Sequence, residues 1–281
     1  MTHSNPTTTT ISTSARLTFS SLGVFGVQAQ GDLADLSSES ITAQDLQDLK
    51  AALAHHGVVL FREQTIGDAD FVAFLRRLGP LTFTMGETAV AEHPDLNIVS
   101  NVGRITPPKS VFHIDTSYIS NPPAYTALRA VTIPSVGGET LFSNQYFAYE
   151  ILPETVKRKL AHAQVSHVAT GVVLDETEER EAKHPLFLKH PISGKHSLYL
   201  STPARCQAIE GMSDQVAQRI ITLLYRRSIR PSRLLRHTWA KGDILIWDNR
   251  CTMHRADHAQ VSSDRVLHRG LVLVEAAIST G

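Results

Sequence analysis

FHIDTSY, residues 112–118, stands near the middle of the chain and carries a histidine and an aspartate two positions apart. A second histidine ends the downstream stretch WDNRCTMH, residues 247–254. Two imidazoles and one carboxylate can occupy one face of an octahedral iron(II) ion, which leaves three positions free for other ligands. His113, Asp115 and His254 are therefore candidate metal ligands and catalytic residues. A fold that unites them must close strands from distant parts of the sequence around one point, as a barrel does.

One His-x-Asp pair is weak evidence by itself. The chain contains 14 histidines and 14 aspartates, so chance supplies close to one such pair, and residues 93–95 (HPD) form another. Side chains two positions apart share a face only on an extended strand, and proline favours a turn or a strand start. We therefore expect residues 93–95 to form a surface loop. The pair around Ile114, a β-branched residue, is expected on a strand or at its end.

The composition is that of an ordinary globular protein: 42% of the 281 residues are hydrophobic, 19% are charged, and the formal net charge is zero. Since there is no basic excess, we expect no binding to nucleic acid. No run approaches the roughly 18 apolar residues of a membrane span. The two cysteines, Cys206 and Cys251, form no Cys-x-x-Cys pair and no disulfide framework, which favours a reducing, cytoplasmic location.

Residues 1–16 are rich in serine and threonine and nearly uncharged, which predicts a disordered tail. No linker rich in serine, glycine or proline divides the remainder, so residues 17–281 are expected to form one domain. Within it, residues 170–184 are rich in glutamate. This segment is either a solvated helix or mobile loop, or a lid over an active site.

Three segments have the pattern of helices. The first, residues 42–57, begins with a capping pattern at Thr42 and ends at a glycine. The second, residues 68–79, is expected to be capped by Asp68 and stopped by Gly-Pro. The third is expected over residues 214–228, with three apolar residues facing inward: Val216, Ile220 and Leu224.

Short apolar or alternating segments predict β-strands along most of the chain. The expected strands are 58–61, 97–102, 124–133, 139–143, 196–200, 234–239, 243–248 and 265–274. Residues 137–138 and 241–243 contain glycine and have the chemistry of hairpin turns. Strands from the first part of the chain to the last, with helices inserted, predict a mainly β fold.

An iron(II) ion needs an external reductant to activate dioxygen, because no side chain here can supply two electrons. No Gly-x-Gly-x-x-Gly fingerprint is present, and the usual reductant is 2-oxoglutarate. Its distal carboxylate requires a buried cation, for which arginine is well suited. Arg265 and Arg269 would point to one face of the strand over 265–274, with Cα atoms about 13 Å apart. Leu267 and Leu271 share that face and favour its burial.

Several motifs in order resemble the TauD/TfdA (taurine dioxygenase/2,4-dichlorophenoxyacetate dioxygenase) family of iron(II)- and 2-oxoglutarate-dependent oxygenases. The similarity extends from about residue 22 to residue 274. Its motifs are HHGVVLFR at 55–62, FLRRLGP at 74–80, HIDTS at 113–117, PSVGGET at 134–140, HPL at 184–186, HP at 190–191, SGK at 193–195, WDNR at 247–250, and the later His254, Arg265 and Arg269.

The resemblance implies a double-stranded β-helix, which is a jelly-roll barrel with flanking helices. His113, Asp115 and His254 would then bind Fe(2+). The hydroxyl of Thr140 and the guanidinium of Arg265 would bind 2-oxoglutarate, the co-substrate used together with O2. Arg269 would lie near the primary substrate and bind its acidic group.

The implied reaction oxidises a C–H bond of a small anionic organic substrate, such as a carboxylate, sulfonate or amino acid, with release of succinate and CO2. Hydroxylation, desaturation and cyclisation all stay open. Phe112 and Ser201 stand where relatives often have Trp and Asn, and residues 82–93 match no relative, so the substrate is not defined. The sequence also leaves open whether the protein is a homo-oligomer.

Two other classes of protein are compatible with the candidate residues. A zinc-dependent hydrolase could use two histidines and one aspartate with a bound water, although no His-Glu-x-x-His pattern is present. A non-catalytic jelly-roll binding module could share the fold. Such a module would be expected to lack a metal ligand or Arg265, and this chain retains all of them.

Overall fold

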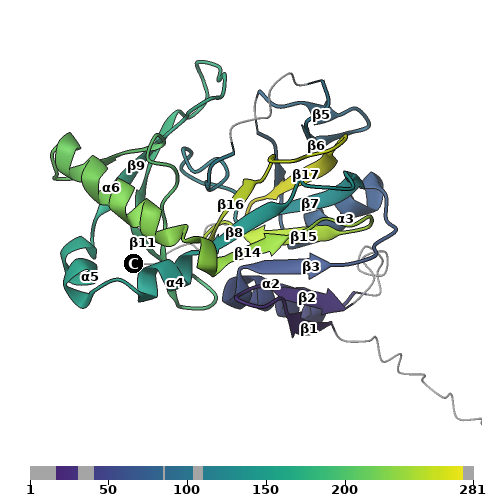
Figure 1. Ribbon diagram of the computed structural model, residues 1–281, viewed down its shortest axis with the longest axis horizontal. Coiled ribbons are helices and arrows are strands. Elements are labelled where there is room, and N and C mark those ends of the chain that lie inside the picture. Colours follow the sequence, from purple (N-terminus) through teal and green to yellow (C-terminus); the bar gives the residue numbers. More distant parts are fainter. Residues whose placement is uncertain (1–16, 31–40, 85, 104–109, 275–281) are drawn as a thin grey trace, which may run out of the picture.

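Two β-sheets that face each other form the centre of the computed structural model, which describes residues 17–30, 41–84, 86–103 and 110–274 (Figure 1). The larger sheet has the strand order β1-β2-β3-β15-β7-β17-β6-β5, and β4 also pairs with β17. Its strands are β1 (Thr18–Ser21), β2 (Val27–Gln30), β3 (Val58–Phe61), β4 (Leu81–Thr82), β5 (Ala89–Val90), β6 (His93–Ser100), β7 (Tyr125–Thr132), β15 (Ile244–Asp248) and β17 (Val266–Val272). The smaller sheet, in the order β14-β8-β16, contains β8 (Thr140–Asn144), β14 (Leu234–His237) and β16 (Thr252–Ala256).

The chain crosses repeatedly between these sheets. It passes from β7 in the larger sheet to β8 in the smaller one, and then from β14 through β15 and β16 to β17, changing sheet at every step. This connectivity is that of a jelly roll, so the expected fold class is confirmed. The expected hairpins at 137–138 and 241–243 are wrong, although Gly137, Gly138 and Gly242 do have positive φ angles. Each turn joins strands of different sheets.

Alternation along the central strands allows one sheet to contact two hydrophobic cores. Val59 and Phe61 of β3 belong to the outer core, whereas Val58 and Leu60 belong to the core between the two sheets. The same rule applies to β17, where Leu267 lies between the sheets and Val272 lies in the outer core. When both faces of a strand are buried, its sequence is a continuous run of apolar residues.

Two helices, α2 (Ala43–His56) and α3 (Asp68–Leu78), supply the outer core on the far side of the larger sheet. As predicted, Thr42 caps α2 in a capping box with Asp45, and the helix ends at Gly57. The predicted cap of α3 is wrong by one residue, because Gly67 is the cap and Asp68 begins the helix. The predicted buried face of α3 is present, and Phe71, Phe74, Leu75 and Leu78 are buried.

A lateral layer packs beside the two sheets and has its own apolar core. It contains α4 (Gln145–Glu150), α5 (Glu154–Leu160), α6 (Asp214–Ser228), β9 (Gln164–Val168), β10 (Glu181–Pro185), β11 (Phe187–Lys189), β12 (His196–Leu198) and β13 (Cys206–Ile209), and the short 3-10 helix η1 (Pro231–Arg233) precedes β14. Helix α6 has the predicted bounds. Of the three residues predicted to face inward, Leu224 is buried and Ile220 is partly buried against the lateral core, whereas the prediction for Val216 is wrong. Ala217 and Ile221 are buried, whereas Val216 is 45% exposed.

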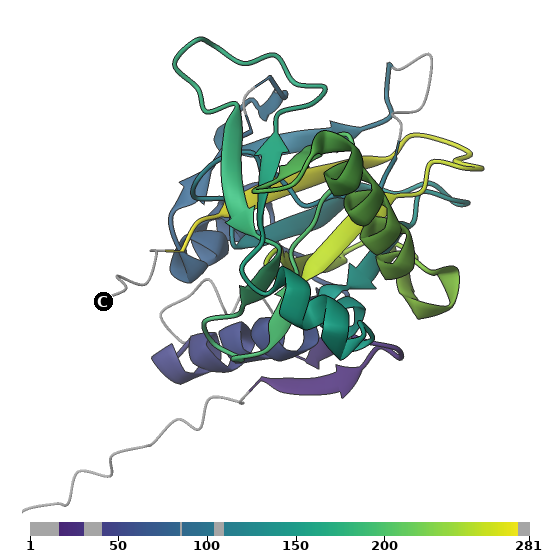
Figure 2. The same cartoon turned by 90° about the vertical axis from the view of Figure 1, so that its left-hand side faces the viewer.

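The glutamate-rich segment 170–184 is not a helix: residues 170–180 form a loop, and residues 181–184 belong to β10. This loop, between β9 and β10, projects from the molecule in the turned view (Figure 2). The expected surface loop at residues 93–95 is also wrong, because these residues begin β6. Asp95 instead accepts a hydrogen bond from Arg76 at the surface, 2.6 Å away.

Residues 1–16, for which a tail is predicted, lie outside the described residues. In the part of the chain that the structure describes, no helix combines the length and the apolar character needed to cross a membrane.

Candidate active site

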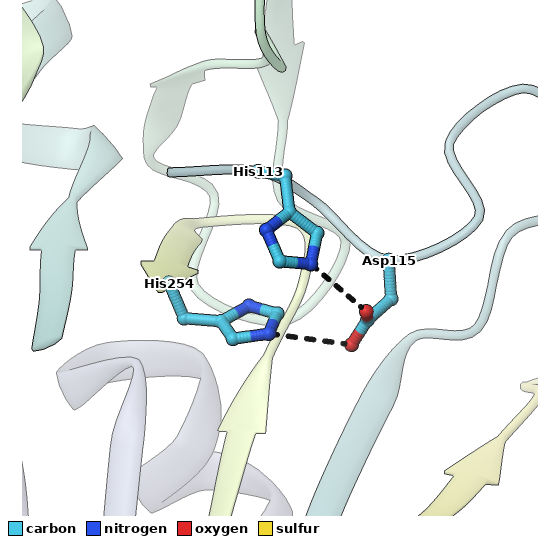
Figure 3. Close-up of side chains that lie close together, drawn as sticks. All are labelled: His113, Asp115 and His254. Atoms are coloured by element: carbon cyan, nitrogen blue, oxygen red, sulfur yellow. Dashed lines mark ion pairs between the residues drawn. The ribbon is translucent and has the colours of Figure 1, made fainter. Parts of the chain in front are cut away.

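His113, Asp115 and His254 lie together, with their side chains pointing towards one another (Figure 3). His254 is on β16, and its backbone pairs with that of His113 through two hydrogen bonds of 2.9 and 3.0 Å. The expected strand around the His-x-Asp pair is therefore only an isolated bridge. Asp115 follows in a turn in which Thr116 has a φ of 41°, and this turn carries the carboxylate back towards both rings.

The three side chains have a spacing that one metal ion can bridge. Nε2 of His113 lies 3.5 Å from Oδ1 of Asp115, and Nε2 of His254 lies 3.8 Å from Oδ2. One donor atom from each residue lies within 4.8 Å of the other two. No second group of this kind occurs among the described residues.

The protonation states also suit a metal. Nδ1 of His113 lies 2.8 Å from the carbonyl oxygen of Val111, so that nitrogen carries the proton and donates, and Nε2 presents a lone pair. Burial lowers the pKa of His254 to about 3, which keeps its ring neutral. Burial alone would raise the pKa of Asp115, but His254, His113 and Arg269 together hold it well below its ordinary value. Metal ions bind such neutral imidazoles and ionised carboxylates.

A chain of hydrogen bonds orients the Asp115 carboxylate. The hydroxyl of Thr126 donates to Oδ2 of Asp115 at 2.7 Å. Nδ2 of Asn249 donates to that hydroxyl at 2.8 Å, and Nε1 of Trp247 donates to Oδ1 of Asn249 at 3.0 Å. Sequence reasoning missed Thr126, which resembles any strand threonine until β7 and β15 are paired.

The motif WDNR at residues 247–250, which contains Trp247 and Asn249, also has a structural role. Asp248 is fully buried, accepts a hydrogen bond from Arg250, and lies with its Oδ2 3.0 Å from Nε2 of His190. Trp247 and Asn249 therefore support Asp115. Asp248 and Arg250 form a buried ion pair that stabilises the turn after β15.

Replacing Thr126 with valine is expected to weaken divalent-metal affinity by about 10- to 100-fold, because ligand-orienting hydrogen bonds contribute about this much. Valine keeps the shape of threonine and removes the donor to Asp115. Metal titration of the purified variant measures the effect, with Thr126→Ser as the matched control that retains the hydroxyl. Equal metal affinities in the valine and serine variants would show that Thr126 has only a packing role.

Arg265 is a buried cation that no described carboxylate neutralises. Its residue is 1% exposed. Nε donates to the carbonyl oxygen of Gly138 at 2.8 Å, and Nη2 donates to Oγ1 of Thr140 at 3.3 Å. Burial lowers the pKa of Arg265 to about 10, so the guanidinium is still charged at neutral pH. An unneutralised buried charge is costly, and its natural complement is an anion from outside the protein.

Thr140 is arranged to donate to that anion. It is buried at the start of β8, and its Oγ1 accepts from Arg265 and, at 3.0 Å, from Nε1 of Trp239. A hydroxyl has two acceptor lone pairs and one donor hydrogen, so the hydrogen is left for a further partner. Gly138 keeps room for this arrangement, because an added Cβ would lie 2.8 Å from Cδ of Arg265.

Arg269 lies between the metal-ligand group and a cluster of oxygen atoms. Its Nη1 is 3.5 Å from Oδ1 of Asp115. Its Nη2 donates to Thr84 at 3.2 Å and to Asn97 at 3.5 Å, and it pairs with the carboxylate of Glu87. The sequence predicted Arg269 on the inner face of β17 but offered no signal for these three partners, which come from β6 and the segment before it.

A cavity of about 470 Å³ connects these groups. Its lining includes both metal-binding histidine candidates, Thr140 and both arginines: His113, His254, Thr140, Arg265 and Arg269. Residues 171–173 of the projecting loop and Glu87 also line it. A cavity of this size suits small organic molecules.

The chain is similar to known dioxygenases in sequence and in fold. The model of the family described as "Taurine catabolism dioxygenase TauD, TfdA family" matches residues 15–271. An alpha-ketoglutarate-dependent (that is, 2-oxoglutarate-dependent) 2,4-dichlorophenoxyacetate dioxygenase from Cupriavidus pinatubonensis is 26% identical over 267 residues, covering 85% of this chain and 92% of that protein.

Two further relatives extend the comparison. An alpha-ketoglutarate-dependent sulfate ester dioxygenase from Pseudomonas putida is 28% identical over 258 residues, covering 83% of this chain and 82% of the relative. The crystal structure of a taurine dioxygenase from Burkholderia xenovorans superposes with a TM-score of 0.79 and 29% identity, covering 92% of this chain and 91% of that one.

Proposed function

The chain belongs to the TauD/TfdA family of dioxygenases, and from this membership we propose that it oxidises a C–H bond of a small anionic organic molecule. The protein is an oxidoreductase that depends on Fe(2+), 2-oxoglutarate and O2. One oxygen atom of O2 enters the succinate formed from 2-oxoglutarate, with loss of CO2, and the other enters the hydroxylated substrate. Desaturation and cyclisation are alternative outcomes of the same oxidation.

In this proposal His113, Asp115 and His254 would hold the iron, which would supply the site at which O2 is activated with electrons from 2-oxoglutarate. Support comes from the donor set, because two imidazoles and one carboxylate on one side suit non-haem iron(II). The carboxylate of Asp115 is held in place by Thr126, and its negative charge is further stabilised by Arg269. His254, which burial keeps neutral, needs no deprotonation before the metal binds.

The observation that carries the proposal is the buried Arg265, which lacks a described carboxylate partner and lines the same cavity as His113 and His254. Neither a zinc hydrolase nor a simple binding module requires such a cation there. We assign Arg265 and the donating hydroxyl of Thr140 to the distal carboxylate of 2-oxoglutarate. A carboxylate that accepts charge-assisted hydrogen bonds in a buried site is held strongly.

Arg269 is assigned to the acidic group of the primary substrate. It lines the cavity beside the metal-ligand group, so an anion bound there would place its neighbouring carbon atoms near the iron. The relatives' names include a 2,4-dichlorophenoxyacetate dioxygenase and a sulfate ester dioxygenase. Carboxylates, sulfonates and sulfate esters are therefore the proposed substrate classes.

Adding iron(II) and then 2-oxoglutarate to the protein without oxygen is expected to produce the weak visible charge-transfer band of an iron(II)–2-oxoglutarate chelate. Succinate release upon admission of oxygen, with mass spectrometry of products from a panel of carboxylates, sulfonates, sulfate esters and amino acids, then identifies the substrate. Absence of the band, together with tight zinc binding and hydrolysis of an ester in the panel, would support the hydrolase alternative instead.

A further inference from the structure

Glu87 forms an ion pair with Arg269, the residue that the proposed function assigns to the acidic group of the substrate. Its carboxylate pairs with Nη2 of Arg269, and Glu87 lines the cavity. The Arg269 side chain is 10% exposed, whereas the Glu87 side chain is 34% exposed. The carboxylate that neutralises the buried guanidinium therefore comes from the protein itself and lies at the solvent side of the pair.

Glu87 binds one of the guanidinium nitrogens of Arg269 that a substrate anion would also bind. A planar guanidinium binds a two-oxygen anion best through two parallel N–H groups. Glu87 accepts from Nη2, while Nε of Arg269 has no hydrogen-bond partner in the described part of the protein. A carboxylate, sulfonate or sulfate ester could engage both nitrogens and would have to displace Glu87 from Nη2.

The charges of the site lead to the same conclusion. The positive charges of Arg265 and Arg269 equal the negative charges of Asp115 and Glu87, and the charges of iron(II) and 2-oxoglutarate also cancel. A substrate with one negative charge would therefore leave one negative charge uncompensated while Glu87 stays in place. When Glu87 turns into solvent, the charges balance, and Thr84 and Asn97 still accept from Arg269.

We propose that Glu87 is a specificity-determining residue that competes, as an internal anion, with the acidic group of the substrate for Arg269. The proposal rests on the assignment of Arg269 under the proposed function. It predicts a site that discriminates against weakly bound anions, because only an anion that outcompetes a tethered carboxylate binds well. A partly exposed ion pair contributes about 1 kcal/mol or less, so the competition lowers anion affinity by a moderate factor and does not block the site.

Replacing Glu87 with glutamine is expected to lower the dissociation constants of plain anions by roughly two- to fivefold. The probes are ethanesulfonate and phenoxyacetate, with the neutral phenoxyacetamide as the uncharged comparison. Calorimetry without oxygen, on protein loaded with iron(II) and 2-oxoglutarate, measures binding with no turnover. The rise in melting temperature caused by inorganic sulfate provides a second reading on the metal-free protein. Phenoxyacetamide should bind the wild type and the variant equally.

Glu92→Gln is the matched control, because Glu92 is an exposed glutamate nearby in the sequence and its replacement should leave anion binding unchanged. Glu87→Ala serves as a second variant and should act in the same direction as Glu87→Gln. The proposal is overturned if both Glu87 variants bind the anions no more tightly than the wild type does. It is also overturned if neither the wild type nor the variants show any anion binding. Weaker binding of taurine in the Glu87 variants would also overturn it, since Glu87 would then be a partner for the substrate's ammonium group.

Arg269→Met separates this proposal from the one on which it rests. If Arg269→Met abolishes anion binding and the Glu87 variants change nothing, only the competition is wrong. If Arg269→Met leaves anion binding intact, the assignment of Arg269 to the substrate is wrong as well. Loss of the visible iron(II)–2-oxoglutarate band in the wild type would instead contradict the proposed function itself.

Discussion

Replacing Asp115 with alanine is expected to abolish succinate formation while the fold stays largely intact. The carboxylate is the anionic member of the three residues proposed to bind the metal, so its loss should exceed the roughly 10- to 100-fold effect of an orienting residue such as Thr126. Alanine at His113 or His254 should have a comparable effect. Metal content, succinate assays and near-ultraviolet circular dichroism of each variant measure the outcome.

The acid dependence of stability gives a separate test of Asp115. Because its pKa is lowered in the folded, metal-free protein, the carboxylate contributes stability that is fully present above its unfolded pKa of about 3.9. That contribution is lost as the pH falls through the lower folded value. The metal-free wild type should therefore be more stable than Asp115→Asn at neutral pH, and the difference should shrink in strong acid.

Asp115→Asn also controls for folding, because the side chain keeps its size and can still accept a hydrogen bond from Thr126. If Asp115→Asn and Asp115→Ala both keep metal binding and succinate formation, Asp115 is not a metal ligand. Unfolding of all three alanine variants would mean that these positions are structural.

Replacing Arg265 with methionine is expected to weaken 2-oxoglutarate binding by about 1.5–3 kcal/mol or more, which corresponds to roughly 10- to 150-fold in the dissociation constant. The cause is the loss of the buried guanidinium that no described carboxylate neutralises. The same substitution should leave the stability of the co-substrate-free protein unchanged or raise it, because an uncompensated buried charge is replaced by an apolar side chain. Calorimetry with 2-oxoglutarate and melting temperatures measure both effects.

Arg265→Lys is the matched control, because it keeps the charge and removes the planar, forked hydrogen-bonding geometry. An intermediate affinity is expected. Arg269→Met should affect the primary substrate more than 2-oxoglutarate. Equal losses for both compounds in the Arg265 and Arg269 variants would contradict the division of roles between the two arginines.

Local sequence patterns predicted the elements best where one rule decides the structure. The capping box at Thr42 and the glycine after α2 specified both helix ends, because they satisfy backbone groups that the helix leaves unpaired. In α6 the inward prediction was right for Leu224 and wrong for Val216, because Val216 and Ala217 are both apolar and only the neighbouring core decides which is buried. The positive φ angles of Gly137 and Gly242 could be predicted from the sequence. Which of the two sheets the following strand joins could not be predicted.

The sequence by itself determined the types of group in the site: two imidazoles, one carboxylate, and two arginines on one face of β17, because strand alternation is a local property. Only the tertiary structure decided that Thr126 orients Asp115, that Arg265 has no described carboxylate partner, and that Glu87 reaches Arg269. The contacts of Thr126 with Asp115 and of Glu87 with Arg269 join positions 11 and 182 residues apart. Turn geometry and the pairing and packing of distant strands set such distances, and no local pattern encodes them.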